Sequence, residues 1–210
     1  MKNPAAALRH LKRSDPILRR LIARVGPLRL HREQSRNQFG TLAEAIIHQQ
    51  LALKAARTIS RRFQQLYAPG RGRLPRPAEL QRTPLRKLRA VGLSRQKISY
   101  LRDLAHRAAR SQLRLGRYAR MTDEQIIDNL IQVKGIGRWT AEMFLIFCLD
   151  RPDVLPVDDL GLQYAIKEAY GLRKLPSAER IRKLAEPWRP NRSIATWYLW
   201  RARRATLGVK

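Results

Sequence analysis

Cysteine, acidic residues and long apolar runs are all scarce in this sequence. Cys148 is the one cysteine among 210 residues, which excludes an internal disulfide and any zinc or iron–sulfur centre built from several cysteines. The four histidines show no metal-ligand spacing. The longest unbroken apolar run, Met143 to Leu149, is far shorter than the roughly 20 residues that cross a bilayer. The first residues, MKNPAAALRHLKR, do not resemble a secretory signal, so we expect a cytoplasmic, nucleoid-associated protein, or a nuclear one in a eukaryote.

The shortage of acidic residues leaves a large positive charge. Only 16 acidic residues oppose 44 basic ones, giving a net charge of +28 and a pI near 11.6. A folded chain with this balance favours a polyanionic partner, and counterion release makes nucleic acid the first candidate. An arginine-rich, solvated surface in a GC-rich genome is the alternative. An anionic membrane is a weaker candidate, because no long amphipathic Lys/Trp helix is present.

The sequence has no convincing alternation of period two, and its apolar residues recur at helical spacing. We therefore predict an all-α protein. Capping residues set the expected helix starts, among them Asp15 as the N-cap before Pro16 and a capping box of Thr122 and Gln125, and glycines set expected ends. The expected helices run from Pro16 to before Gly26, over 40–51, 54–67, 78–82 and 84–90, onward from Ser94, over 123–132 and 138–149, from Asp158 or Asp159 to before Gly171, and onward from Ser177 and from Asn191.

The segment IQVKGIGRWTAE, residues 131–142, is the most informative motif. Gly135 and Gly137 permit a tight turn between two helices and a close approach of its backbone to a ligand. The helix that follows presents free N–H groups, which favours phosphate binding. The same glycines could also form an ordinary corner between helices, but Arg138 and the charge of +28 favour DNA contact.

Two further segments carry candidate chemistry. Asp158 and Asp159 precede a predicted helix, so one can cap the helix while the other faces a cleft. The C-terminal segment WRPNRSIATWYLWR is rich in aromatic residues. Such residues more often fill a core, but aromatic walls with basic surroundings also suit a base that has been flipped out of a duplex.

Taken in order, five segments resemble the helix-hairpin-helix base-excision DNA glycosylases, specifically the 3-methyladenine DNA glycosylase II (AlkA/Mag-like) branch. The segments are IIHQQLALKAA, VGLSRQKISYLRDLA, VKGIGRWTAE, VLPVDDLGLQ and WRPNRSIATWYLWR, and the resemblance covers about residues 38–204. It implies two helical subdomains with a DNA-binding cleft between them. The expected division is a central six-helix domain over 38–152, with the hairpin at about 123–149, and a second domain formed by 1–37 and 153–210.

The resemblance also assigns roles to residues. Asp159 matches the catalytic aspartate, which leaves helix capping to Asp158. Trp139, Met143 and Trp200 match positions of the base pocket. Trp139 stands where lyase-active relatives carry a Schiff-base lysine, which implies a monofunctional hydrolase, and Lys134 is not expected to act as a nucleophile.

The remaining implied roles concern DNA contact. They fall on the hairpin, at Gly135, Ile136, Gly137 and Arg138, and on a loop whose side chain fills the gap left by the flipped nucleotide, at Gln50 and Leu51. No cofactor is required, although the backbone carbonyls of Ile131, Val133 and Ile136 match those that hold a Na⁺ or K⁺ ion in relatives.

The expected function is hydrolysis of the N-glycosidic bond of alkylated bases flipped out of double-stranded DNA, in base excision repair, by a monomer that does not bind membranes. Two alternatives stay open. Met143 stands where some relatives carry tyrosine, which keeps open a sister glycosylase for deaminated or oxidised bases. A non-catalytic helix-hairpin-helix DNA-binding module is the alternative of a different class, and the Asp158–Asp159 pair speaks against it.

Overall fold

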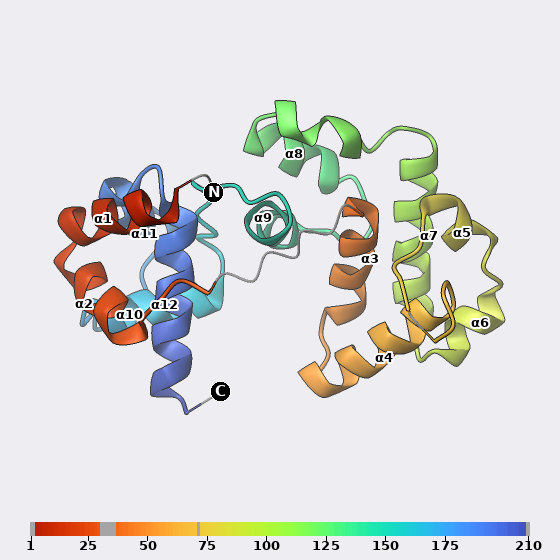
Figure 1. Cartoon of the computed structure of the whole chain (residues 1–210), viewed down its shortest axis with the longest axis horizontal. Helices are drawn as coiled ribbons and strands as arrows, with labels where there is room; N and C mark the ends of the chain where they lie inside the picture. The colour runs from red at the N-terminus through yellow and green to blue at the C-terminus, as the bar shows by residue number, and fades with distance from the viewer. Residues whose placement is uncertain (1–2, 30–36, 71, 209–210) are drawn as a thin grey trace. The chain divides into compact units, whose positions relative to one another are not determined.

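The computed structural model describes residues 3–29, 37–70 and 72–208, and within these ranges it contains helices and no strand. The chain forms two compact units (Figure 1). One consists of Met1–Arg32 with Leu145–Lys210, and the other of Glu33–Phe144. This division falls inside a helix, α9 (Arg138–Phe147), whereas the sequence interpretation divides the chain near 38 and 152. No described helix is long and apolar enough to span a membrane.

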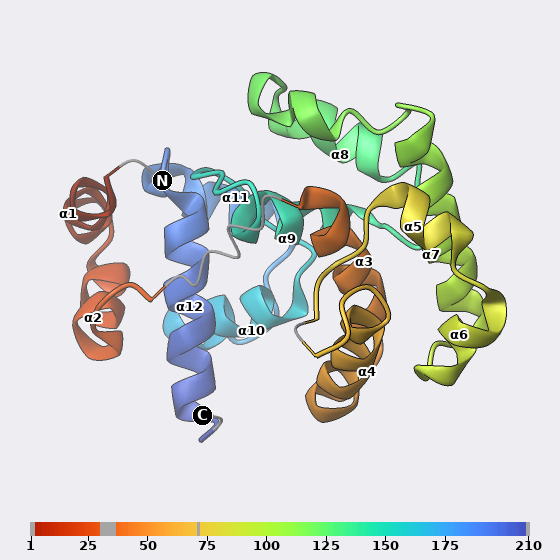
Figure 2. The ribbon, with the colours of Figure 1, turned by 45° about the vertical axis from the view of Figure 1, so that its right-hand side comes forward.

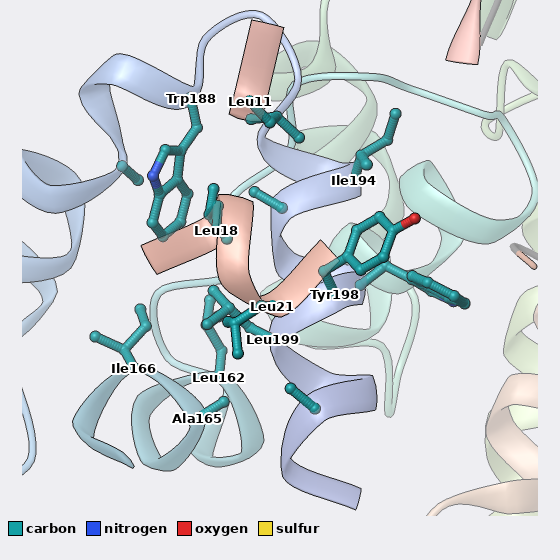
Figure 3. Packing of buried hydrophobic residues seen from close by; sticks show 14 of the residues in the cluster. Leu11, Leu18, Leu21, Leu162, Ala165, Ile166, Trp188, Ile194, Tyr198 and Leu199 are labelled. Carbon is teal, nitrogen blue, oxygen red and sulfur yellow. The ribbon is translucent and has the colours of Figure 1, made fainter. Parts of the chain in front are cut away.

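The unit that contains both chain ends is built around α12 (Arg192–Thr206), which packs against two other helices of the unit (Figures 1 and 2). These are α2 (Pro16–Val25) and α10 (Leu160–Ala169). The unit is completed by α1 (Pro4–Ser14), α11 (Ala178–Ala185) and the 3₁₀ helix η2 (Glu186–Trp188). Figure 3 shows its core, in which leucines of α1 and α2 meet apolar residues of α10 and α12.

A buried carboxylate fixes the start of α2 in this core. Asp15 is the N-cap of α2, and its Oδ1 accepts the backbone N–H groups of Ile17 and Leu18 at 2.8 and 3.1 Å. Its Oδ2 accepts the hydroxyl of Tyr170 at 2.5 Å and the indole N–H of Trp188 at 2.8 Å. Burial and the neighbouring Asp15 raise the pKa of Tyr170, so the phenol remains a proton donor to the carboxylate. The predicted pairing of Asp15 as N-cap with Pro16 in the first turn is confirmed.

The second unit is organised around the long helix α7 (Arg95–Ala109), which packs against α3 (Gln38–His48), α5 (Pro77–Arg82) and α6 (Leu85–Ala90). Helix α4 (Leu53–Gln65) packs against α3. After α7, the chain continues through the 3₁₀ helix η1 (Leu115–Arg120) into α8 (Asp123–Leu130). Fully buried residues form its core. They include Leu42, Ile46, Phe63, Leu101, Leu104, Tyr118, Ile126 and Leu130.

The predicted helices are present, with most ends within a few residues of the predicted ones. Ser94, Ser177 and the Thr122–Gln125 capping box make the predicted hydrogen bonds. Asn191 occupies the N-cap position of α12 but makes no capping hydrogen bond with its side chain. Helices α1 and η1 were not predicted.

Candidate active site and nucleic-acid interface

The hairpin between α8 and α9 requires a glycine at position 135. Gly135 has a φ of +82°, a conformation that L side chains rarely adopt. A Cβ at this position would also overlap the ring of Tyr100 from α7. Gly137 differs, because a Cβ there would meet nothing within 4 Å. The first glycine therefore allows the turn and its packing, and the second leaves space beside the first turn of α9, where a phosphate could approach the backbone.

The other two predicted hairpin residues, Ile136 and Arg138, are already engaged in contacts within the protein. Ile136 is buried, and its N–H donates to the carbonyl of Val133 at 3.0 Å, so Ile136 supports the turn from inside. Arg138 pairs with Glu124 of α8 at 2.6 Å and with the buried Glu142 of α9 at 3.3 Å. The hydrogen bond with Glu124 is the main cause of a raised Arg138 pKa. A phosphate contact of Arg138, which would compete with these carboxylates, stays a prediction.

The loop between α3 and α4 is exposed. Gln50 has a φ of +54°, and the side chain of Leu51 is 36% exposed. The loop is joined to the hairpin within the same unit, because Gln49 Nε2 donates to the carbonyl of Gly135 at 2.7 Å. An apolar side chain on an exposed loop that is fixed to the hairpin suits a wedge, and this role of Leu51 stays a prediction.

Asp159 lies at the start of α10 and is half-buried. Its Oδ1 accepts the backbone N–H of Leu162 at 2.6 Å and the indole N–H of Trp200 at 2.8 Å. The expectation that Asp158 caps this helix is wrong, since Asp159 is the N-cap and Asp158 is exposed. Both donors named here are neutral, and the N-terminus of the helix favours a negative charge. One oxygen of the carboxylate is thus held in a fixed orientation.

Trp200 is the residue that orients this carboxylate from α12. Its ring stacks on Phe147 with centroids 6.1 Å apart and an interplanar angle of 20°. The stacking fixes the indole plane, and the indole N–H fixes Asp159. The sequence interpretation assigned Trp200 to the base pocket and missed Phe147. The available signal was its spacing, because Trp139, Met143 and Phe147 recur every four residues and so share one face of α9.

Trp139 and Met143 lie in the first turns of α9, in the unit that carries the hairpin. Trp139 is 46% exposed, which is high for a tryptophan, and Met143 is half-buried. Their expected role in binding a base stays a prediction. Lys134 is exposed, and its backbone N–H donates to Asp103 Oδ2 at 2.9 Å.

The hairpin carbonyls are the expected cation ligands. The carbonyl of Val133 accepts the N–H of Ile136, which leaves it a second lone pair. Among the described residues, no group of three histidine, cysteine or acidic side chains could hold a metal ion.

An all-helical chain with a glycine hairpin and a fixed, half-buried aspartate is typical of the helix-hairpin-helix class of DNA-acting proteins. Residues 43–190 match the model of the HhH-GPD superfamily of base excision DNA repair proteins. The chain therefore belongs to this superfamily.

Several relatives match this chain over most of their own length. A protein of Schizosaccharomyces pombe named DNA-3-methyladenine glycosylase 1 is 36% identical, over 91% of this chain and 84% of its own. The solved structure of the S. pombe 3-methyladenine DNA glycosylase Mag1 in complex with abasic DNA has a TM-score of 0.81 at 35% identity, covering 93% of this chain and 95% of that one. A DNA-3-methyladenine glycosidase from Bacillus halodurans has a TM-score of 0.85 at 32% identity, covering 99% and 92%.

Proposed function

We propose that this protein is a monofunctional DNA glycosylase that hydrolyses the N-glycosidic bond of alkylated bases of the 3-methyladenine type, as a step of base excision repair. The observation that carries the proposal is the Asp159 carboxylate, held at the start of α10 by the N–H groups of Leu162 and Trp200. Relatives named as 3-methyladenine glycosylases, at 36% and 32% identity, support the substrate class.

The chemistry follows from charge. An N-alkylated purine is already a cationic leaving group, so its departure needs little acid catalysis. As the bond breaks, the sugar gains oxocarbenium character, and a fixed carboxylate stabilises this positive charge. Because Trp200 and Leu162 both hold Oδ1 of Asp159, little reorganisation is needed at the transition state. We assign to the same carboxylate the orientation of the attacking water.

Double-stranded DNA is the proposed partner, and the proposed complex has one protein molecule per lesion. The charge of +28 supplies affinity for phosphates, and the open space beside Gly137 lies at the N-terminus of α9, where backbone N–H groups favour an anion. Leu51 is proposed to fill the gap left by the extruded base. We propose that the protein is located with the DNA, in the nucleoid of a bacterium or in the nucleus of a eukaryote.

A release assay tests this function. Duplex DNA methylated with an alkylating agent is incubated with the protein, and free bases are separated and quantified. We expect release of 3-methyladenine or 7-methylguanine and no strand cleavage until alkali is added. DNA binding without release of any base would favour the non-catalytic module instead. An excision profile that also includes hypoxanthine and oxidised bases tests the sister-glycosylase alternative that Met143 leaves open.

We also propose that a Na⁺ or K⁺ ion binds the carbonyls of Ile131, Val133 and Ile136. The tight turn places these three carbonyls within six residues, and the carbonyl of Val133 keeps a second lone pair. Replacing potassium by a bulky organic cation at equal ionic strength is expected to weaken DNA binding. Unchanged binding would contradict the proposal.

A further inference from the structure

One side of α7 contacts both loops that are proposed to touch DNA. Lys97, Tyr100 and Asp103 recur every three residues and so lie on the same side of the helix. We call this side the Lys97 face. Helix α7 packs against α3, which leads into the 49–52 loop (Figure 1). Lys97, the 49–52 loop and the hairpin turn all lie within one compact unit of the protein.

Lys97 holds the end of α3. Its ammonium group donates to the carbonyl of Ile47 at 2.5 Å and to that of Gln49 at 2.7 Å. Carbonyls at a helix C-terminus lack partners inside the helix and attract a cation. No glycine ends this helix; instead Gln50 adopts a φ of +54° just beyond it. Lys97 therefore fixes the point at which the loop that carries Leu51 leaves α3.

The same face holds the hairpin. The Tyr100 ring packs where a Cβ of residue 135 would lie. Asp103 accepts the backbone N–H of Lys134 at 2.9 Å and is itself held by Arg107 at 3.0 Å. The hairpin backbone is therefore fixed to α7 by packing at one residue and by a charge-assisted hydrogen bond at the preceding one.

Gln49 joins the two loops directly. Its amide nitrogen donates to the carbonyl of Gly135 at 2.7 Å, and Thr140 Oγ1 lies 3.4 Å from the same nitrogen. Gln49 thus links Lys97 to the hairpin. Its backbone carbonyl accepts a hydrogen bond from Lys97, and its side chain donates one to the hairpin carbonyl of Gly135. A shift of either loop would break one of these bonds.

We propose that Gln49 and Lys97 are positioning residues, which fix the spacing between the wedge loop and the phosphate-binding hairpin and thereby couple phosphate binding to base extrusion. This inference rests on the proposed function. Phosphate contacts alone fix where the protein lies on a duplex. If the wedge loop is held at a set distance from the hairpin, binding of the hairpin to phosphates also drives the wedge into the base stack. Binding energy gained at the phosphates is then used to open the stack.

The test separates general DNA affinity from recognition of an opened site. Binding is measured to an undamaged duplex and to a duplex with a tetrahydrofuran abasic analogue beside 2-aminopurine, whose fluorescence reports unstacking. We expect Gln49→Met and Lys97→Met each to bind undamaged DNA within about twofold of the wild type. We expect their preference for the abasic duplex, and the fluorescence change, to fall about five- to tenfold, the scale of one or two hydrogen bonds.

Matched control variants make the same Gln→Met and Lys→Met substitutions at other positions of the protein. Gln65→Met and Lys87→Met change exposed residues of α4 and α6 and are expected to keep the preference, with Lys87→Met matching the lost charge. A purely structural role of Gln49 and Lys97 would lower both affinities together, along with the melting temperature, and would overturn the proposal. A preference of both variants for the abasic duplex that stays within twofold of the wild-type preference would also overturn the proposal. Failure of the proposed function is a separate result, because the wild type itself would then release no base.

Discussion

Asp159 combines a structural and a proposed chemical task in one side chain. As N-cap it accepts the N–H of Leu162, and through the same oxygen it accepts the indole N–H of Trp200. A capping carboxylate is common, and here an aromatic donor from another helix also fixes its orientation. Asp15 is also an N-cap that accepts an indole N–H, but Asp15 is buried whereas Asp159 is half-buried. The contribution of the indole N–H of Trp200 to Asp159 can be measured without changing the carboxylate.

Trp200→Phe removes this donor and keeps an aromatic ring to stack on Phe147. We expect the single-turnover excision rate to fall by at least about tenfold, because one hydrogen bond to a charged group contributes about 1.5–3 kcal/mol. DNA affinity should change little, and the melting temperature should fall by several degrees because the hydrogen bond also contributes to stability. Trp197→Phe, the same replacement one turn earlier in α12, is the control. An unaltered rate in Trp200→Phe would show that the indole N–H does not act through Asp159.

The sequence predicted the candidate site residues one at a time and not their contacts. Asp159 and Trp200 were each identified by resemblance, but they are 41 positions apart and no local pattern indicates their hydrogen bond. Local rules also could not decide which of Asp158 and Asp159 caps α10, since either residue suits the N-cap position. Gln49 and Lys97 gave no signal, because their partners are backbone carbonyls, which any sequence supplies.

At the level of elements, the two glycines of the hairpin act differently. Gly135 combines a φ of +82° with the packed ring of Tyr100, whereas Gly137 faces open space. We therefore expect the first glycine to contribute to folding, and we propose that the second allows the approach of a ligand. The two can be separated by making the same substitution at both.

Gly135→Ala is expected to lower the free energy of unfolding by at least about 1–2 kcal/mol, the cost of a left-handed alanine, before Tyr100 is displaced. Gly137→Ala is expected to keep stability and to weaken DNA binding, because its Cβ occupies the space beside the N-terminus of α9. Chemical denaturation and duplex affinity check the two. A stable Gly135→Ala with normal DNA affinity would contradict this account of the hairpin.

Helix positions followed from local signals wherever caps were present. The helix over 40–51 was predicted too long, because α3 ends at His48 and the break is made by Gln50, a residue that does not usually mark one. Helix α1 was missed although Asn3 caps it, accepting the N–H of Ala6 at 3.0 Å, with Pro4 in the first turn. These residues are a helix start signal. Helix η1 has no such signal and contains Gly116.

At the scale of the whole molecule, charge is the dominant property. With 44 basic and 16 acidic residues, the protein is expected to bind any duplex through phosphates, and selection of damaged sites has to come from the few residues described above. Composition alone favoured nucleic acid as the partner, since this preference depends on the sum of charges and not on their arrangement, whereas duplex DNA was implied by the family resemblance.

Affinity for an undamaged duplex is expected to fall steeply with salt. For about six neutralised phosphates, the dissociation constant should rise by about 10³-fold between 50 and 200 mM monovalent salt. Fluorescence anisotropy over a salt series gives the slope. A nearly flat dependence would show that the positive charge lies away from the bound DNA.

The proposed chemistry depends on the negative charge of the Asp159 side chain. The variant Asp159→Asn tests this requirement most directly. Asparagine is as good an N-cap as aspartate and can still accept from Leu162 and Trp200, so stability and DNA affinity should be retained. Single-turnover release of 7-methylguanine should fall by at least about 10²-fold, whereas Asp158→Asn, the matched neighbour, should remain active. Excision by Asp159→Asn at the wild-type rate would contradict the assignment.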